Sequence, residues 1–200
     1  MEGNRITCTK KYQYGCAGSW YPLRMGTFIF LDTETTGINP ARDRIIEVAA
    51  LKWKDGKILD RFEALVHPGV PIPYEIKLLT GISDDDVKNA PRFLEVKEKL
   101  VAFIGDDPIV GHNTQFDTGF LKSHHLTLKN PEIDTVVLAR ILLRKESSYA
   151  LEVLMKKYGL TLRNSHRAIA DAETTISFFE FLLWKITEIP KEVFEELERI

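Results

Sequence analysis

Two acidic residues stand at the end of an apolar run, in the stretch FIFLDTETTG at residues 28–37. The run that opens this stretch is typical of a buried strand, and Asp32 and Glu34 follow it directly. Because residues two apart in a strand point to the same face, both carboxylates should leave the sheet side by side, together with Phe28 and Phe30. Like charges this close raise each other's pKa unless a cation holds both ionised, and a divalent metal ion with oxygen ligands does this.

Two more aspartates and a histidine occupy positions where helices should face the sheet. Asp117 lies in HNTQFDTGFL, three residues before Phe120, beside the apolar face of a predicted helix. Asp171 lies in a later predicted helix, in which Phe178 follows seven residues further on the same face. His166 comes just before that helix, so its side chain can lean over whatever Asp171 faces.

The four acidic residues share one difficulty, because an apolar core does not bury carboxylates that lack partners. Each one taken alone has an ordinary explanation as a hydrogen-bonded carboxylate, and a histidine at a helix start is commonly a capping or surface residue. No lysine or arginine lies at a sequence spacing that would pair each of the four. Metal coordination at one shared site explains all four at once, so the pattern predicts a metal site.

The elements that must position these side chains follow from the hydrophobic pattern and the turn residues. We predict strands at 27–33, 45–54, 58–66 and 108–113, with a hairpin turn at the DGK of 55–57. We predict helices at 74–79, from Pro91 to about 104, from the capping residue Asn113 to about 125, at 134–143, at 149–158 up to Gly159, at 167–186, and a short one after Pro190. This order of elements indicates an α/β fold with a mixed sheet and helices on its faces.

Length and composition fit one domain with a hydrophobic core. The chain has 200 residues, of which 44% are hydrophobic, and its formal net charge is −2. No apolar stretch reaches the ~18 residues of a membrane span, and the start lacks the apolar core of a signal peptide, so we expect a cytoplasmic protein with no membrane contact. Residues 1–24 are polar and without periodicity, so we expect a poorly ordered extension ahead of a domain at 25–200.

Taken together, these motifs resemble the DEDDh exonuclease superfamily, and within it the DnaQ-like enzymes typified by the proofreading epsilon subunit of bacterial replicative DNA polymerase. The resemblance spans about 26–185 and is highly specific because the motifs occur in order and at suitable spacing. It is carried by DTETTG at 32–37, LLTGISDDDV at 78–87, His112-Asn113 with Phe116-Asp117, and His166 five residues before Asp171. A histidine at 166, in place of a tyrosine, is typical of the histidine branch.

The resemblance implies a ribonuclease H-like fold, which is a mixed sheet of about five strands flanked by helices. It also implies hydrolysis of a nucleic acid from its 3′ end, releasing nucleoside 5′-monophosphates. Asp32, Glu34, Asp117 and Asp171 would then be ligands of two divalent cations, Mg²⁺ or Mn²⁺, and His166 would be the general base.

Several further residues are candidates for contact with the substrate, in addition to Asp32, Glu34 and His166. By resemblance, Glu75 and Thr80 fall where such enzymes contact the terminal nucleotide. Ile82 and Phe116 are candidates for stacking against bases, although both could equally belong to the core. The candidates for following the phosphate chain, or for ordinary surface, are Arg42, Arg44, Lys122, Arg163 and Arg167.

Three functions remain open at the level of sequence. The first is a 3′–5′ exonuclease of proofreading or repair that acts on a single-stranded or frayed 3′ end of DNA, which DTETTG favours. The second is an RNA-directed member of the same superfamily, and the third is a noncatalytic docking module. Epsilon-type subunits carry a longer C-terminal tail that binds the polymerase, so we expect either a stand-alone nuclease or docking on a polymerase subunit through another surface.

Overall fold

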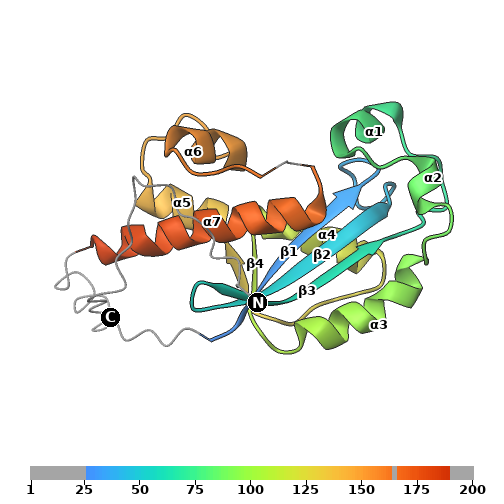
Figure 1. Ribbon diagram of the computed structural model, residues 1–200, viewed down its shortest axis with the longest axis horizontal. Coiled ribbons are helices and arrows are strands. Elements are labelled where there is room, and N and C mark those ends of the chain that lie inside the picture. The colour runs from blue at the N-terminus through green and yellow to red at the C-terminus, as the bar shows by residue number, and fades with distance from the viewer. Residues whose placement is uncertain (1–25, 164–165, 190–200) are drawn as a thin grey trace, which may run out of the picture.

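A five-stranded sheet forms the centre of the computed structural model, which describes residues 26–163 and 166–189 (Figure 1). The strands are β1 (Phe28–Thr35), β2 (Ile45–Lys54), β3 (Lys57–Leu65), β4 (Ile109–Gly111) and β5 (Glu132–Asp134). Their order is β3-β2-β1-β4-β5. β1, β2 and β3 are antiparallel neighbours, whereas β4 and β5 run parallel to β1. This confirms the predicted mixed sheet.

Helices cover both faces of the sheet (Figure 1). α3 (Phe93–Ile104) and α4 (Thr114–Ser123) pack on one face, and α7 (Ala168–Thr187) packs on the other. α5 (Thr135–Leu142) and α6 (Leu151–Lys157) pack against α7. α1 (Tyr74–Thr80) and α2 (Asp84–Val87) stand near the C-terminal end of β1. No helix in the described ranges has the length and apolar character that crossing a membrane requires.

The hairpin between β2 and β3 follows the local chemistry of its turn. Asp55 and Gly56 both have positive φ, 49° and 78°, as a two-residue turn that matches the strand twist requires. Trp53 and Lys54 then pair with Ile58 and Lys57 across the hairpin. The predicted turn at 55–57 is therefore confirmed.

The side chains of β1 alternate between two halves of the core. Ile29 and Leu31 face α3 and α4, where they join a cluster that includes Phe93, Leu100 and Phe120. Their neighbours on β1 face α7 instead, where an aromatic cluster joins the sheet to the helix. The rings of Phe28, Phe30, Trp53 and Phe179 lie with centroids 5.4 to 6.1 Å apart in five contacting pairs.

Two local features that differ from the sequence prediction are β5 and the start of α4. β5 is missed because a strand of three residues is too short to show an alternating pattern. Asn113 does not cap α4 through its side chain; its φ is 71°, and its backbone N–H donates to Asp134. Asp134 instead caps α5 by accepting from the Val136 N–H. The extension at 1–24 and the short helix after Pro190 lie outside the described residues.

We predict that Phe179→Ala lowers the free energy of unfolding by about 3–5 kcal/mol, because Phe179 is 2% exposed and its ring contacts three others. Urea unfolding monitored by circular dichroism measures this change. The control is Ile141→Ala on α5, where the side chain is 59% exposed and the expected change is within ~0.5 kcal/mol. Equal effects of the two substitutions would contradict the role of the aromatic cluster.

Candidate active site

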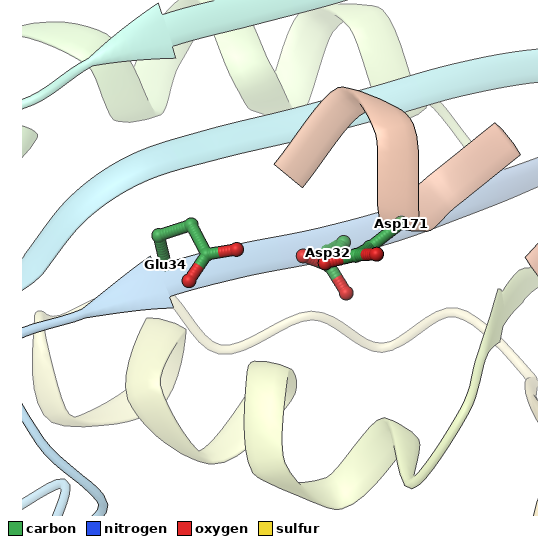
Figure 2. Close-up of side chains that lie close together, drawn as sticks. All are labelled: Asp32, Glu34 and Asp171. Atoms are coloured by element: carbon green, nitrogen blue, oxygen red, sulfur yellow. The ribbon is translucent and has the colours of Figure 1, made fainter. Parts of the chain in front are cut away.

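Three carboxylates meet where the end of β1 faces the start of α7. Asp32 and Glu34 leave β1 on the face of Phe30, as their spacing predicts, and Asp171 lies in the first turn of α7. One carboxylate oxygen from each residue lies within 4.8 Å of those of the other two. Figure 2 shows Asp32 and Asp171 approaching each other from strand and helix, with Glu34 further along β1.

Asp117 approaches the same region from α4, but it is bound to the backbone of β1. Its Oδ1 accepts hydrogen bonds from the N–H of Thr33 at 2.8 Å and from the Thr33 hydroxyl at 2.7 Å. β4 pairs with β1 only at Ile29 and Phe30, so Asp117 supplies the acceptor that a longer β4 would have given to Thr33. The structure thus brings three of the four predicted ligands together and holds the fourth beside Asp32.

The four carboxyl groups all have a raised pKa. Burial raises the pKa of Asp32 well above its ordinary range, and the nearby Asp117 and Glu34 raise it further. Burial, followed by Asp171, raises the pKa of Glu34 to about 8. Burial raises the pKa of Asp117 to about 7, against the opposing effect of the Thr33 hydrogen bonds, and burial also raises the pKa of Asp171.

None of these carboxylates takes part in an ion pair among the residues that the structure describes. In residues 26–163 and 166–189, no lysine, arginine or histidine side chain forms an ion pair with Asp32, Glu34, Asp117 or Asp171. A set of carboxylate oxygens with no sulfur or imidazole among them suits a hard divalent cation. The residues present therefore fit a metal site, because a cation would remove the repulsion that raises their pKa values.

His166 precedes α7 and is connected to Asp171 through its backbone. The N–H of His166 donates to Oδ2 of Asp171 at 2.9 Å. The backbone of His166 is left-handed, with φ of 67°, and its side chain is partly exposed. Its Nε2 lies 3.7 Å from Oε1 of Glu152 on α6. The backbone of His166 therefore lies beside Asp171, whereas its ring faces Glu152 in this conformation.

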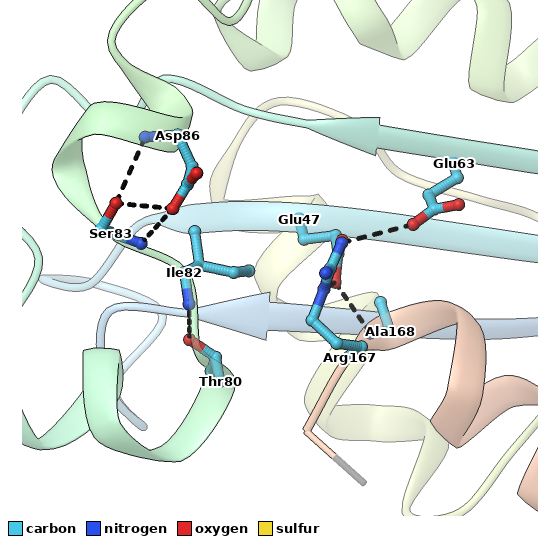
Figure 3. Close-up of polar contacts among 8 residues, drawn as sticks. All are labelled: Glu47, Glu63, Thr80, Ile82, Ser83, Asp86, Arg167 and Ala168. Atoms are coloured by element: carbon cyan, nitrogen blue, oxygen red, sulfur yellow. Dashed lines mark hydrogen bonds and ion pairs between the residues drawn. The ribbon is translucent and has the colours of Figure 1, made fainter. Parts of the chain in front are cut away.

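The candidates for substrate contact fall into two groups. Glu75 is exposed on α1, and Phe116 is partly buried with its ring 4.9 Å from that of Phe120. Thr80 is buried: its hydroxyl donates to the carbonyl of Ile76 and accepts from the N–H of Ile82 (Figure 3). Ile82 is 2% exposed in the small core under α1 and α2, which favours the core role that the sequence left open for its side chain.

Two of the basic residues considered for the phosphate chain are engaged in ion pairs. Arg163 contacts Glu173 at 2.9 Å, and Arg167 contacts Glu47 and Glu63. Sequence reasoning missed Glu47, which sits inside the apolar run IIEVAALKWK and has no neighbour in sequence that marks it as special. The only available signal was its presence within an apolar run, the same signal that singled out Asp32 and Glu34.

His112, which carries part of the family resemblance, holds the scaffold together. Its two ring nitrogens lie 2.9 Å from the Thr135 hydroxyl and 2.8 Å from the carbonyl oxygen of Tyr149. Burial lowers its pKa, which favours the neutral ring. His112 thereby ties the end of β4 to the segment just before α6, the helix that carries Glu152.

Comparison with known proteins places the chain in a family. Residues 29–179 match the model of the family described as "Exonuclease". The chain is 43% identical over 181 residues to the "DNA polymerase III PolC-type" of Bacillus subtilis (strain 168), covering 88% of this chain and 12% of that protein. It is 41% identical over 165 residues to the protein of the same name in Clostridium perfringens (strain 13 / Type A), covering 80% and 11%. The chain thus spans about an eighth or less of the length of these relatives.

Solved structures share the fold. Exonuclease X in complex with 5′ overhanging duplex DNA has a TM-score of 0.66 and 26% identity, covering 78% of this chain and 90% of that one. The nuclease domain of 3′hExo, a DEDDh family member bound to rAMP, has a TM-score of 0.71 and 19% identity, covering 82% and 94%. The sheet and its flanking helices are therefore ribonuclease H-like, as the resemblance implied. The chain belongs to the exonuclease family.

Proposed function

We propose that this chain hydrolyses DNA from a single-stranded or frayed 3′ end, releases nucleoside 5′-monophosphates, and does so in proofreading or repair. One observation carries the proposal: Asp32, Glu34 and Asp171 converge to within 4.8 Å and form no ion pair with any described residue, in a chain that matches the exonuclease family. The DNA polymerase III relatives and the DNA complex of Exonuclease X support DNA as the substrate. The same relatives support docking on a DNA polymerase. We also propose that the nuclease domain extends beyond the matched residues 29–179, over 25–200.

The carboxylates would hold two divalent cations, Mg²⁺ or Mn²⁺. Asp32, Glu34 and Asp171 form the centre of the site, and Asp117 is the neighbour that completes the acidic set. When bound, such cations offset the negative charge of the phosphodiester and lower the pKa of the attacking water. By positioning them at the end of β1, the chain sets where the 3′ end must lie.

His166 would accept the proton of the attacking water, because histidine is the side chain that most often serves as a general base. In this conformation its Nε2 faces Glu152, so the ring must turn from α6 toward Asp171 before it can act. The ring has room to turn, since the His166 side chain is partly exposed and its ring makes no hydrogen bond in the described part of the chain. Turnover should therefore depend on closure around the substrate.

Glu75 is the remaining candidate for contact with the terminal nucleotide beyond the carboxylates. It is exposed in the first turn of α1, and this helix stands near the end of β1 (Figure 1). Thr80, the last residue of α1, joins the helix to Ile82 instead of facing outward. Its hydroxyl donates to the carbonyl of Ile76 and accepts from the N–H of Ile82. Phe116 is only partly buried, so a base could stack against its ring.

The proposal is tested with 5′-end-labelled single-stranded DNA, duplex DNA, 3′-mismatched duplex DNA and single-stranded RNA, each with and without a chelator. We expect shortening from the 3′ end, release of 5′-monophosphates, faster cutting of mismatched than of matched ends, and loss of activity with chelator. Faster degradation of RNA than of DNA would assign the chain to the RNA-directed class. Absence of hydrolysis with both Mg²⁺ and Mn²⁺ would revive the noncatalytic docking module.

Metal binding should offset the loss of stability that the metal-free protein shows as the pH rises. A carboxyl whose pKa is raised by folding, such as Glu34 at about 8, stays protonated in the folded state while the unfolded state ionises above about pH 4.5. The metal-free protein should therefore lose stability as the pH rises from about 4.5 to 8, and Mg²⁺ should raise Tm more at pH 8 than at pH 6. Differential scanning fluorimetry with EDTA and with MgCl₂ measures both effects.

The variant for this test is Glu34→Gln, which removes one repelling charge and one ligand. It should flatten the pH dependence of the metal-free Tm and reduce the Mg²⁺-induced rise. Glu98→Gln, at an exposed position on α3, is the matched control and should change neither. A Mg²⁺-induced rise that is unchanged in Glu34→Gln would exclude Glu34 from the site.

We predict that His166→Ala lowers turnover by about 10²–10⁴-fold while Mn²⁺ affinity, measured by calorimetry, stays near the wild-type value. The reason is that the side chain is not a ligand, and its backbone bond to Asp171 survives the substitution. His166→Asn is the companion variant, since asparagine tolerates a φ of 67° better than alanine does. Parallel loss of turnover and of Mn²⁺ affinity in both variants would tell against a base.

A further inference from the structure

Glu47 is a fully buried carboxylate that the proposed chemistry does not use. It lies on β2, directly across from Glu34 on β1, and its exposed fraction is 0%. Residues opposite each other in an antiparallel pair project from the same face, so Glu47 stands next to the metal-ligand candidates. Its charge is one of the causes that raise the pKa values of Asp32, Glu34 and Asp171.

The carboxylate of Glu47 is fully occupied by the start of α7 (Figure 3). The Nε of Arg167 donates to Oε1 at 3.0 Å and to Oε2 at 3.1 Å, and Nη2 of Arg167 donates to Oε1 as well. The backbone N–H of Ala168 donates to Oε2 at 2.8 Å. Both donors are consecutive residues, 120 and 121 positions away from Glu47 along the chain.

This contact caps the helix from a distance. Arg167 stands at the N-cap of α7 and makes no capping hydrogen bond with its own side chain. The first N–H groups of a helix have no partner within it, and a negative charge at that end is favourable. Glu47 supplies both the acceptor and the charge, so β2 fixes the position and direction of the first turn of α7.

The first turn of α7 and the residue before it carry two groups of the site. His166 immediately precedes Arg167, and Asp171 lies in the first turn. The hydrogen bond between the His166 N–H and Asp171 Oδ2 joins these two groups to each other. Any shift of the Glu47 anchor would therefore move both of them relative to Asp32 and Glu34 on β1.

Arg167 also decides which carboxylates can serve as ligands. Without it, Glu47 would be one more unpaired carboxylate beside Glu34. With it, the charge of Glu47 is balanced by a guanidinium that engages both of its oxygens. Glu63 on β3, 3.4 Å from Nη2, adds a second and more exposed acceptor.

We propose that Glu47 is a positioning residue of the nuclease site: paired with Arg167, it anchors the start of α7 so that His166 and Asp171 meet the carboxylates of β1, and the pairing keeps Glu47 itself out of the ligand set. The inference rests on the function proposed above. Partners of this kind around a metal site change activity by roughly 10–100-fold when removed.

The test compares three variants of the full chain. Glu47→Met with Arg167→Met replaces the buried ion pair by apolar side chains of similar length, a change that proteins commonly tolerate. Glu47→Gln keeps an acceptor for the Ala168 N–H and for Arg167. Arg61→Met is the matched control, because it removes another ion pair between β3 and α7, that with Glu173, without touching Glu47.

The double variant should keep Tm within a few degrees and Mn²⁺ affinity within a few-fold of wild type, while kcat on single-stranded DNA falls about 10–100-fold and KM changes little. Glu47→Gln should recover most of the lost kcat, and Arg61→Met should retain wild-type kcat. Hydrogen exchange should show faster exchange of the amides at 168–171 in the double variant only.

Three results would overturn the proposal. One is wild-type kcat in the double variant. Another is a parallel loss of kcat, Mn²⁺ affinity and Tm that Glu47→Gln does not relieve, which would make Glu47 a structural residue only. The third is unchanged protection of the amides at 168–171. A wild-type chain without hydrolysis would instead defeat the proposed function, and the exchange data would still decide whether Glu47 anchors α7.

Discussion

The repulsion among unpaired carboxylates at the end of β1 is the constraint on which the rest of the structure depends. Asp32, Glu34 and Asp171 are brought within 4.8 Å although burial and mutual repulsion both oppose their ionisation. The favourable energy has to come from elsewhere in the fold. The aromatic cluster of Phe28, Phe30, Trp53 and Phe179 contributes to it, because each ring pair adds about 0.5–1.5 kcal/mol beyond burial of its surface. Phe30 in this cluster lies two residues before Asp32 on the same face of β1. The packing that stabilises the domain thus also sets the spacing of its carboxylates.

Two classes of carboxylate lie under and around α7, and the difference between them defines the site. Glu47 and Glu173 have arginine partners, and the charge they carry is balanced within the protein. Asp32, Glu34 and Asp171 have none in the described part of the chain, so their charge is available to something from outside. Acidic residues that serve only solubility are usually exposed, whereas these three lie between a strand and a helix.

The sequence was sufficient for the parts of the site that follow from local periodicity. The period of two in a strand placed Asp32 and Glu34 on one face with Phe28 and Phe30, and the structure confirms this. Helical periodicity placed Asp117 and Asp171 on or beside the inward faces of their helices, where Phe120 and Phe178 are buried. The mixed character of the sheet followed from the order of the elements, and the family followed from the motifs.

Features that depend on pairs far apart in sequence could not be predicted. The partner of Glu47 is 120 residues away, so no pattern in IIEVAALKWK could show that this glutamate is bound to Arg167. For the same reason Arg167 looked like a surface residue suited to phosphate. Asp117 was predicted to be a ligand, whereas its hydrogen bonds to Thr33 depend on β4 being only three residues long. β5, with three residues of its own, could not be seen either.

The N-terminus of α7 is where these local and distant features meet. A helix start carries partial positive charge and unpaired N–H groups, and no side chain at the N-cap of α7 satisfies them. Glu47 satisfies one of these groups by accepting from the N–H of Ala168, the first residue of the helix. Asp171 instead accepts from the N–H of His166, the residue before the N-cap. The charge of Glu47 is balanced by Arg167, whereas Asp171 lies with Asp32 and Glu34 in the candidate metal site. At this helix end, Glu47 therefore anchors the helix, while Asp171 remains available as a carboxylate beside β1.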